Sequence, residues 1–229
     1  MARIKVCGNL YAMDAHMVAS YEPDYMGWIF VPSSRRRISP DKAIRIIRSI
    51  RLNHPGIQHV AVMGGMGLDE MVRLLKLLLV RYLEDRPSLD LDAIQIIGSS
   101  QDIYRMEQFL RGQGIELPMW PVVHVGAPVT DEDLKSLASA QLYLLDRKVT
   151  GALGGTGKEI PESWIQDVQL PYMLAGGINP ENARHRLLNS HAMGVDIASG
   201  LETGVPGRKD PARLDALFAS LADLRSWVK

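Results

Sequence analysis

The sequence predicts an α/β fold in which eight strands, each followed by a helix, close into a single (β/α)8 TIM barrel. Short apolar runs alternate with helix-period segments almost to the end of the 229 residues, and eight such units suit a barrel of this length. Glycines also gather where the predicted strands meet the predicted helices. An open, doubly wound sheet is the structural alternative.

The strands are assigned to short apolar runs and the helices to longer segments with a helical period. The predicted strands are Ile4–Cys7, Tyr25–Phe30, His59–Met63, Ala93–Ile97, Met119–Val125, Leu142–Asp146, Tyr172–Ala175 and Val195–Ala198. The predicted helices are Tyr11–Ser20, Pro40–Arg51, Leu68–Leu83, Gln101–Arg111, Asp131–Ala138, Pro161–Val168, Pro180–Leu188 and Pro211–Leu224. Ser39, Thr130 and Asp210 each place a side-chain acceptor near a helix start, where they predict N-caps.

The composition predicts one domain, residues 1–229, in the cytoplasm. Hydrophobic residues make up 46% of the chain, enough for a large core, and no Pro/Ser-rich linker divides it. Basic and acidic residues number 26 each, which gives no bulk charge for binding nucleic acid or an anionic membrane. The most apolar stretch, Leu74–Val80, is too short to span a bilayer and contains Lys76. A single cysteine fits a reducing compartment.

The segment Leu68–Leu83 is apolar over a wider arc than one barrel helix needs. Burial under the connection that follows explains this arc, and so does a contact between subunits. We therefore expect a monomer or, as a weaker prediction, a homodimer.

Glycines at the predicted seventh and eighth strand ends indicate a phosphate site. Ala175-Gly176-Gly177-Ile178 ends one strand, and Asp196-Ile197-Ala198-Ser199-Gly200 ends the next. Barrels often bind phosphate between these two loops through backbone N–H groups and a short helix start, and glycine allows the close approach. The alternative is that both are ordinary structural turns.

Two reactive side chains end predicted strands. Cys7, the only cysteine, follows the alternating run Arg3-Ile4-Lys5-Val6, and Asp146 ends Leu142–Asp146. A thiol assisted by positive charge is a base, and a carboxyl group whose pKa is raised by burial is an acid, so the two suit a base and acid pair. Inert burial is the alternative for Cys7, and binding of loop amides is the alternative for Asp146.

Further charged residues lie near the predicted strand ends. Arg35-Arg36-Arg37 forms either a solvated loop or a site in which one arginine binds a substrate carboxylate. Lys158 is a second anion candidate or a surface lysine. Among the scattered histidines only His124 is placed near a strand end, so we predict no metal. No Walker or GxGxxG motif is present, and no cofactor is predicted.

Together these segments resemble the phosphoribosylanthranilate isomerase family of tryptophan biosynthesis, from end to end and in chain order. The matching segments are Lys5-Val6-Cys7-Gly8, Gly27 to Pro40, Leu144-Leu145-Asp146, Gly154-Gly155-Thr156-Gly157-Lys158, Leu174 to Asn182, Val195-Asp196, Ser199 to Glu202 and Pro206 to Asp210. The resemblance implies a cofactor-free (β/α)8 barrel that converts N-(5'-phosphoribosyl)anthranilate to the 1-deoxyribulose form by an Amadori rearrangement.

The resemblance also implies roles for individual residues. Asp146 is the expected general acid, Cys7 the expected general base, and Arg36 the expected ligand of the anthranilate carboxylate. Asp196 is expected near the sugar. The remaining substrate-binding residues it implies, mainly toward the phosphate, are Gly155, Gly176, Gly177, Ser199 and Gly200.

The sequence departs from the family pattern in its middle third. The third strand ends in Met63-Gly64-Gly65, the fourth lacks the usual histidine and ends in Ile97-Gly98, and Asn9-Leu10 and Arg37 also differ from the pattern. These changes leave two alternatives open. One is a related sugar-phosphate isomerase whose aglycone pocket is altered by Met63 and Ile97, and the other is a non-catalytic phosphosugar-binding protein.

Overall fold

Eight parallel strands form a closed barrel in which each strand pairs with the next and β8 returns to β1. The computed structural model describes residues 1–79, 90–147 and 159–225. The strands are β1 Arg3–Cys7, β2 Tyr25–Ile29, β3 Gln58–Gly64, β4 Ala93–Ile97, β5 Met119–Val125, β6 Tyr143–Arg147, β7 Tyr172–Leu174 and β8 Gly194–Ile197. The predicted fold class is therefore confirmed.

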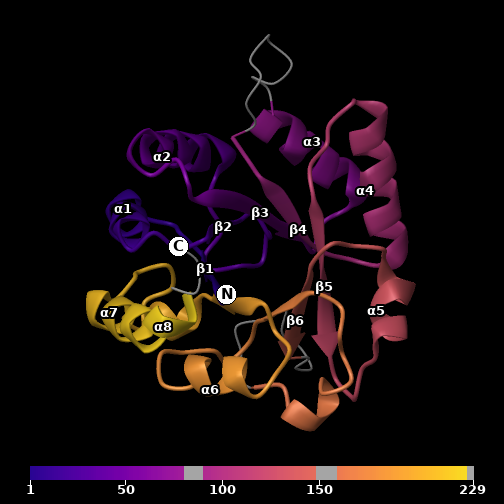
Figure 1. Cartoon of the computed structure of the whole chain (residues 1–229). Helices are drawn as coiled ribbons and strands as arrows, with labels where there is room; N and C mark the ends of the chain where they lie inside the picture. Colours follow the sequence, from indigo (N-terminus) through magenta and orange to yellow (C-terminus); the bar gives the residue numbers. More distant parts are fainter. Residues whose placement is uncertain (80–89, 148–158, 226–229) are drawn as a thin grey trace.

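Helices surround the strands (Figure 1). They are α1 Ala12–Ser20, α2 Pro40–Asn53, α3 Leu68–Leu79, α4 Ser100–Gly112, α5 Asp131–Leu137, α6 Ala183–Leu188, α7 Pro211–Ser220 and α8 Ala222–Arg225, with short 3-10 helices η1 Glu162–Trp164 and η2 Ser199–Leu201. None of the helices in the described ranges is long and apolar enough to cross a membrane.

The buried hydrophobic residues form two clusters, a larger one between the helices and the strands and a smaller one inside the barrel. Successive residues of a strand face opposite sides of the sheet, so one set of strand residues packs against the helices and the alternate set faces the barrel interior. On β1, Ile4 and Val6 pack in the larger cluster that includes the helices. The smaller cluster fills the interior and consists of Val60, Ala93, Trp120, Val122, Leu142, Leu144 and Met173. Lys5 and Cys7 alternate with Ile4 and Val6, so their side chains point into the barrel.

The prediction of a helix over Pro161–Val168 is wrong, because this connection forms only the 3-10 turn η1. The amides of Trp164, Ile165 and Val168 donate to the carbonyl three residues earlier, at 3.0, 3.1 and 3.2 Å. The carboxylate of Asp131 accepts the next free amides, those of residues 169 and 170, and Pro171 follows. A residue before proline disfavours the helical conformation, so the turn does not extend.

Two other helix predictions need smaller corrections, and a third is described only in part. The predicted helix Pro180–Leu188 begins later, at Ala183, since the Asn179 side chain accepts from the amides of residues 181 and 182 in a turn. The predicted helix Pro211–Leu224 divides into α7 and α8 at Leu221. Residues 80–83 of the predicted helix Leu68–Leu83 lie outside the described residues.

The capping predictions hold at two of three helices. Thr130 forms a reciprocal capping box with Asp133, and the Asp210 carboxylate accepts from the amide of Ala212 at 2.9 Å. Ser39 was expected to cap α2 and forms no side-chain cap bond. Pro40 follows it at the first position, where proline provides the helical φ and has no amide to satisfy.

Candidate active site

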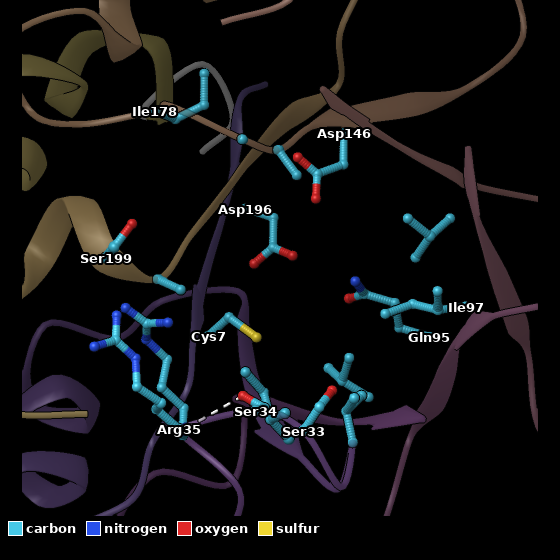
Figure 2. A pocket seen from close by; sticks show the side chains of 18 of the residues that line it. Cys7, Ser33, Ser34, Arg35, Gln95, Ile97, Asp146, Ile178, Asp196 and Ser199 are labelled. Atoms are coloured by element: carbon cyan, nitrogen blue, oxygen red, sulfur yellow. Dashed lines mark hydrogen bonds between the residues drawn. The ribbon is translucent and has the colours of Figure 1, made fainter. Parts of the chain in front are cut away.

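A cavity of about 470 Å³ opens at the carboxyl ends of the strands. Its lining includes seven of the predicted site residues, which lie at or just after the ends of five different strands. They are Cys7, Arg36, Asp146, Gly176, Gly177, Asp196 and Ser199. Figure 2 shows Cys7, Asp146 and Asp196 pointing into the same space, although Cys7 and Asp146 lie far apart in the sequence. A site of this size and position is typical of barrel enzymes.

The Cys7 thiol packs against the bare backbone of Gly27 on the neighbouring strand. A β-carbon at Gly27 would lie 2.5 Å from Cys7 Sγ and 3.0 Å from Lys5 Nζ. The register of β1 and β2 pairs Cys7 with Gly27 directly. Glycine at this position therefore leaves the room that the thiol and the ammonium group share.

Lys5 is fully buried beneath the thiol and has two close partners. Its Nζ donates to Asp196 Oδ2 at 2.8 Å and to Gln95 Oε1 at 2.7 Å. The second carboxylate oxygen of Asp196, Oδ1, is buried and has no hydrogen-bond partner in the described part of the chain. An acceptor of this kind, beside a cavity, is available for a hydroxyl group of a ligand.

The thiol is held mainly in its protonated form. Burial raises the pKa of Cys7 above its usual value, and the Asp196 carboxylate adds to this effect. The ammonium groups of Lys5 and Lys209 act in the opposite direction because they stabilise the thiolate. In this site, burial therefore opposes ionisation of the thiol, and the two ammonium groups favour it.

Asp146 has the environment of a carboxylic acid that keeps its proton to a higher pH than an exposed aspartic acid does. Burial, together with the nearby Asp196 carboxylate, raises the pKa of Asp146 to about 6, against a small opposing effect of the Arg147 amide. A β-carbon on Gly176 would overlap Asp146 Oδ1, so glycine at this position makes room for the carboxyl group. A weak acid poised in this range is suited to donate a proton.

Arg36 is fixed at the cavity wall by a bidentate ion pair. Its Nε and Nη2 donate to the two oxygens of Glu202, each at 2.7 Å. Glu202 also accepts from the amide of Gly207 and lies 3.6 Å from Lys209 Nζ. Although burial alone would raise it, Arg36 and these neighbours lower the pKa of Glu202. The N–H groups of Arg36 that Glu202 does not occupy are free to bind an anion.

The loops after β7 and β8 expose backbone amides toward the cavity. Gly176 and Gly177 both adopt positive φ, 74° and 70°, which favours glycine. Within the described ranges, the amides of Gly177, Ile178, Ser199 and Gly200 donate to no acceptor. Gly200 itself does not line the cavity; a β-carbon there would overlap the carbonyl of Ile178, so its role is to let the two loops approach.

The remaining residues singled out from the sequence have different outcomes. Gly155 and Lys158 fall outside the described residues. Ile97 lines the cavity, with Val62 on the adjacent strand. Met63 was expected to alter the same pocket, but it is fully buried in the cluster on the helix side. That prediction is wrong because the strand alternation turns Met63 away from the barrel interior.

The sequence reasoning assigned no role to three residues that complete the site: Lys5, Gln95 and Glu202. A signal for two of them was present, because Lys5 and Gln95 are polar residues at inward positions of apolar strands. Glu202 follows the eighth strand and carried no signal of its own. Among the described residues, no group of three or more histidine, cysteine, aspartate or glutamate side chains is arranged to hold a metal ion.

Comparison with known proteins gives one consistent family. Residues 4–220 match the family model described as N-(5'phosphoribosyl)anthranilate (PRA) isomerase. The chain is 28% identical to the N-(5'-phosphoribosyl)anthranilate isomerase of Dehalococcoides mccartyi over 97% of each chain. It is 29% identical to the isomerase of Geobacillus thermodenitrificans, covering 93% of this chain and 91% of the relative.

A solved structure agrees with this result. The phosphoribosyl anthranilate isomerase from Thermus thermophilus superposes with a TM-score of 0.77 at 28% identity, covering 97% of this chain and 100% of that one.

Proposed function

The chain belongs to the N-(5'-phosphoribosyl)anthranilate isomerase family, and we propose that its barrel cavity performs that isomerisation with Asp146 as general acid and Cys7 as general base. The reaction converts N-(5'-phosphoribosyl)anthranilate to 1-(2-carboxyphenylamino)-1-deoxyribulose 5-phosphate in tryptophan biosynthesis. The observation that carries the proposal is the convergence of Cys7, Asp146 and Arg36 on one cavity.

The two proton transfers assign complementary roles. Asp146 donates its proton to the ring oxygen of the ribose as the bond from that oxygen to C1' breaks, which gives a Schiff base. The Cys7 thiolate then removes the proton from C2', and the resulting enolamine tautomerises to the ketone. The pKa of Asp146, raised to about 6 by burial, supports the acid role because part of the carboxyl population keeps its proton near neutral pH.

Substrate binding divides between two sides of the cavity. The free N–H groups of Arg36 suit the anthranilate carboxylate, and the unpaired amides of Gly177, Ile178 and Ser199 suit the phosphate. The apolar side chains of Val62 and Ile97 suit the aromatic ring. Together these groups would contact the carboxylate, the ring and the phosphate of the small-molecule phosphosugar substrate.

The direct test is a fluorescence assay for loss of N-(5'-phosphoribosyl)anthranilate by the purified protein. We expect turnover of this compound and much weaker turnover of the phosphoribosylamine of aniline, which lacks the carboxylate. Equal turnover of the two would remove Arg36 from the proposed binding role. Absence of turnover for the anthranilate compound, with turnover of another phosphoribosylamine, would favour the altered-aglycone alternative.

Gly27→Ala is expected to reduce kcat because the new methyl group displaces the Cys7 thiol and the Lys5 ammonium group. Overpacking of this kind also destabilises a fold by about 1–3 kcal/mol. Kinetics and thermal melting measure the two effects separately. The matched control is Gly56→Ala, since a β-carbon at Gly56 meets nothing within 4 Å. An unchanged kcat for Gly27→Ala would mean that the close packing of Cys7 and Lys5 over Gly27 does not matter for the reaction.

Glu202→Gln is expected to raise KM for the substrate, since the amide replaces one of the two acceptors that orient Arg36. A loss of one charge-assisted hydrogen bond corresponds to about a tenfold change or more. The matched control is Asp223→Asn, which breaks an exposed bidentate pair with Arg184. If both variants behave alike in KM, Glu202 does not position Arg36 for binding.

A further inference from the structure

The two proton transfers described above assign no role to the buried ammonium group of Lys5. We propose that Lys5, held by Gln95 and Asp196, is a positioning residue whose charge stabilises the Cys7 thiolate. This inference rests on the proposed function of Cys7 as the base. It makes Lys5 the group that allows a buried thiol to lose its proton.

The ammonium group of Lys5 lies beside the thiol of Cys7. Lys5 Nζ and Cys7 Sγ share the space over Gly27. Two other strands supply the remaining contacts of Nζ. Asp196 lies on the adjacent strand β8, where it pairs in register with Lys5, and Gln95 reaches Nζ across the barrel interior from β4. Figure 2 shows Cys7, Asp196 and Gln95 directed into the cavity from different strands. The side chain is 0% exposed, so water screens its charge little.

The two other cations near the thiol, Lys209 and Arg36, have partners other than the sulfur. Lys209 Nζ donates to the carbonyls of Cys7 and Ala198, at 2.7 and 3.1 Å, and lies near Glu202. Arg36 is held by the same Glu202 in a bidentate pair. Lys5 is therefore the cation placed at the thiol itself.

Two acidic groups face the site from the remaining strands. Asp196 competes with the thiolate for Lys5, and Asp146 lies beyond Asp196 on β6. Asp196 uses only Oδ2 in its bond to Lys5. The ammonium group is thus shared between the Asp196 carboxylate and the thiolate that forms at Cys7. This sharing predicts that removing the cation and removing the competing anion affect the thiol in opposite directions.

The test measures the pKa of Cys7 from the rate of alkylation by iodoacetamide as a function of pH. Cys7 is the only cysteine in the chain, so no other thiol contributes. Lys5→Met is expected to raise the thiol pKa by about 1–3 units, the range for loss of an opposite charge at close distance. Alkylation at neutral pH then slows by about tenfold or more. Asp196→Asn is expected to lower the pKa.

A merely structural disturbance would not give shifts of opposite sign. A folded Lys5→Met protein whose thiol pKa equals or falls below that of the unaltered protein would overturn the proposal. If Lys5→Met does not fold, the double variant Lys5→Met, Asp196→Asn removes the buried pair together and leaves no unpaired charge. Its thiol pKa must then lie above that of Asp196→Asn alone, and equality would overturn the proposal.

The same measurement separates this inference from the proposed function. Alkylation reports on the thiol whether or not the protein isomerises its substrate. A shifted thiol pKa in Lys5→Met, together with full activity of Cys7→Ser, would keep the Lys5 effect and remove the base role. An unshifted thiol pKa in Lys5→Met, together with an inactive Cys7→Ser, would keep the base role of Cys7 and remove the proposed effect of Lys5.

Discussion

Cys7→Ser is expected to lower kcat by about 10²–10⁴-fold, the contribution typical of a positioned general base. Serine has nearly the size of cysteine, so it fits the buried space over Gly27. Its hydroxyl group, however, does not ionise in the accessible pH range, so it cannot remove the C2' proton. Steady-state kinetics with N-(5'-phosphoribosyl)anthranilate measure the effect.

Affinity is expected to remain, because the carboxylate and the phosphate are proposed to be bound by N–H groups that the substitution does not remove. Calorimetry with a product analogue, the reduced form of 1-(2-carboxyphenylamino)-1-deoxyribulose 5-phosphate, serves as the control. Cys7→Ala is a second variant, which lacks any hydrogen-bonding group on its side chain. A loss of affinity equal to the loss of kcat would mean that Cys7 binds substrate rather than transfers a proton. Full activity of Cys7→Ser would remove the base assignment.

The fold was predictable because its strands follow one simple rule. A parallel strand buried on both faces is a short apolar run, and the alternation of such runs with helical segments specifies the barrel. The same alternation predicts which residues reach the cavity, since Cys7 and Asp146 lie at inward positions near the ends of their strands. It also corrects the reading of Met63, which lies one residue from the inward position Val62.

Pairings between distant segments were not predictable. Lys5 and Asp196 become neighbours only when β8 closes on β1, and no local pattern at either residue specifies its partner. Glu202 reaches Arg36 across two loops that the sequence separates widely. The absence of the predicted helix Pro161–Val168 has a similar cause, because Asp131, on α5, accepts the amides that would extend the turn.

Asp146→Asn is expected to lower kcat by about 10²–10⁴-fold and to change the shape of the pH profile. The productive form of the site needs a protonated Asp146 and an ionised Cys7. Burial raises the pKa of Asp146 to about 6 and raises that of the thiol above its usual value, so the acid loses its proton before the base does. The productive form is therefore a minor species, and its population has a distinctive dependence on pH.

Below a pH of about 6 the carboxyl group is protonated, and kcat/KM rises with pH as thiolate forms. Above that value each gain in thiolate is offset by loss of the Asp146 proton, so kcat/KM levels off until the thiol titrates. Asparagine has no proton to lose, so in Asp146→Asn the small remaining activity continues to rise through this region. The substrate phosphate also titrates near a pH of about 6, which provides the decisive comparison. If the levelling near that pH persists in Asp146→Asn, it belongs to the phosphate, and Asp146 is not the acid.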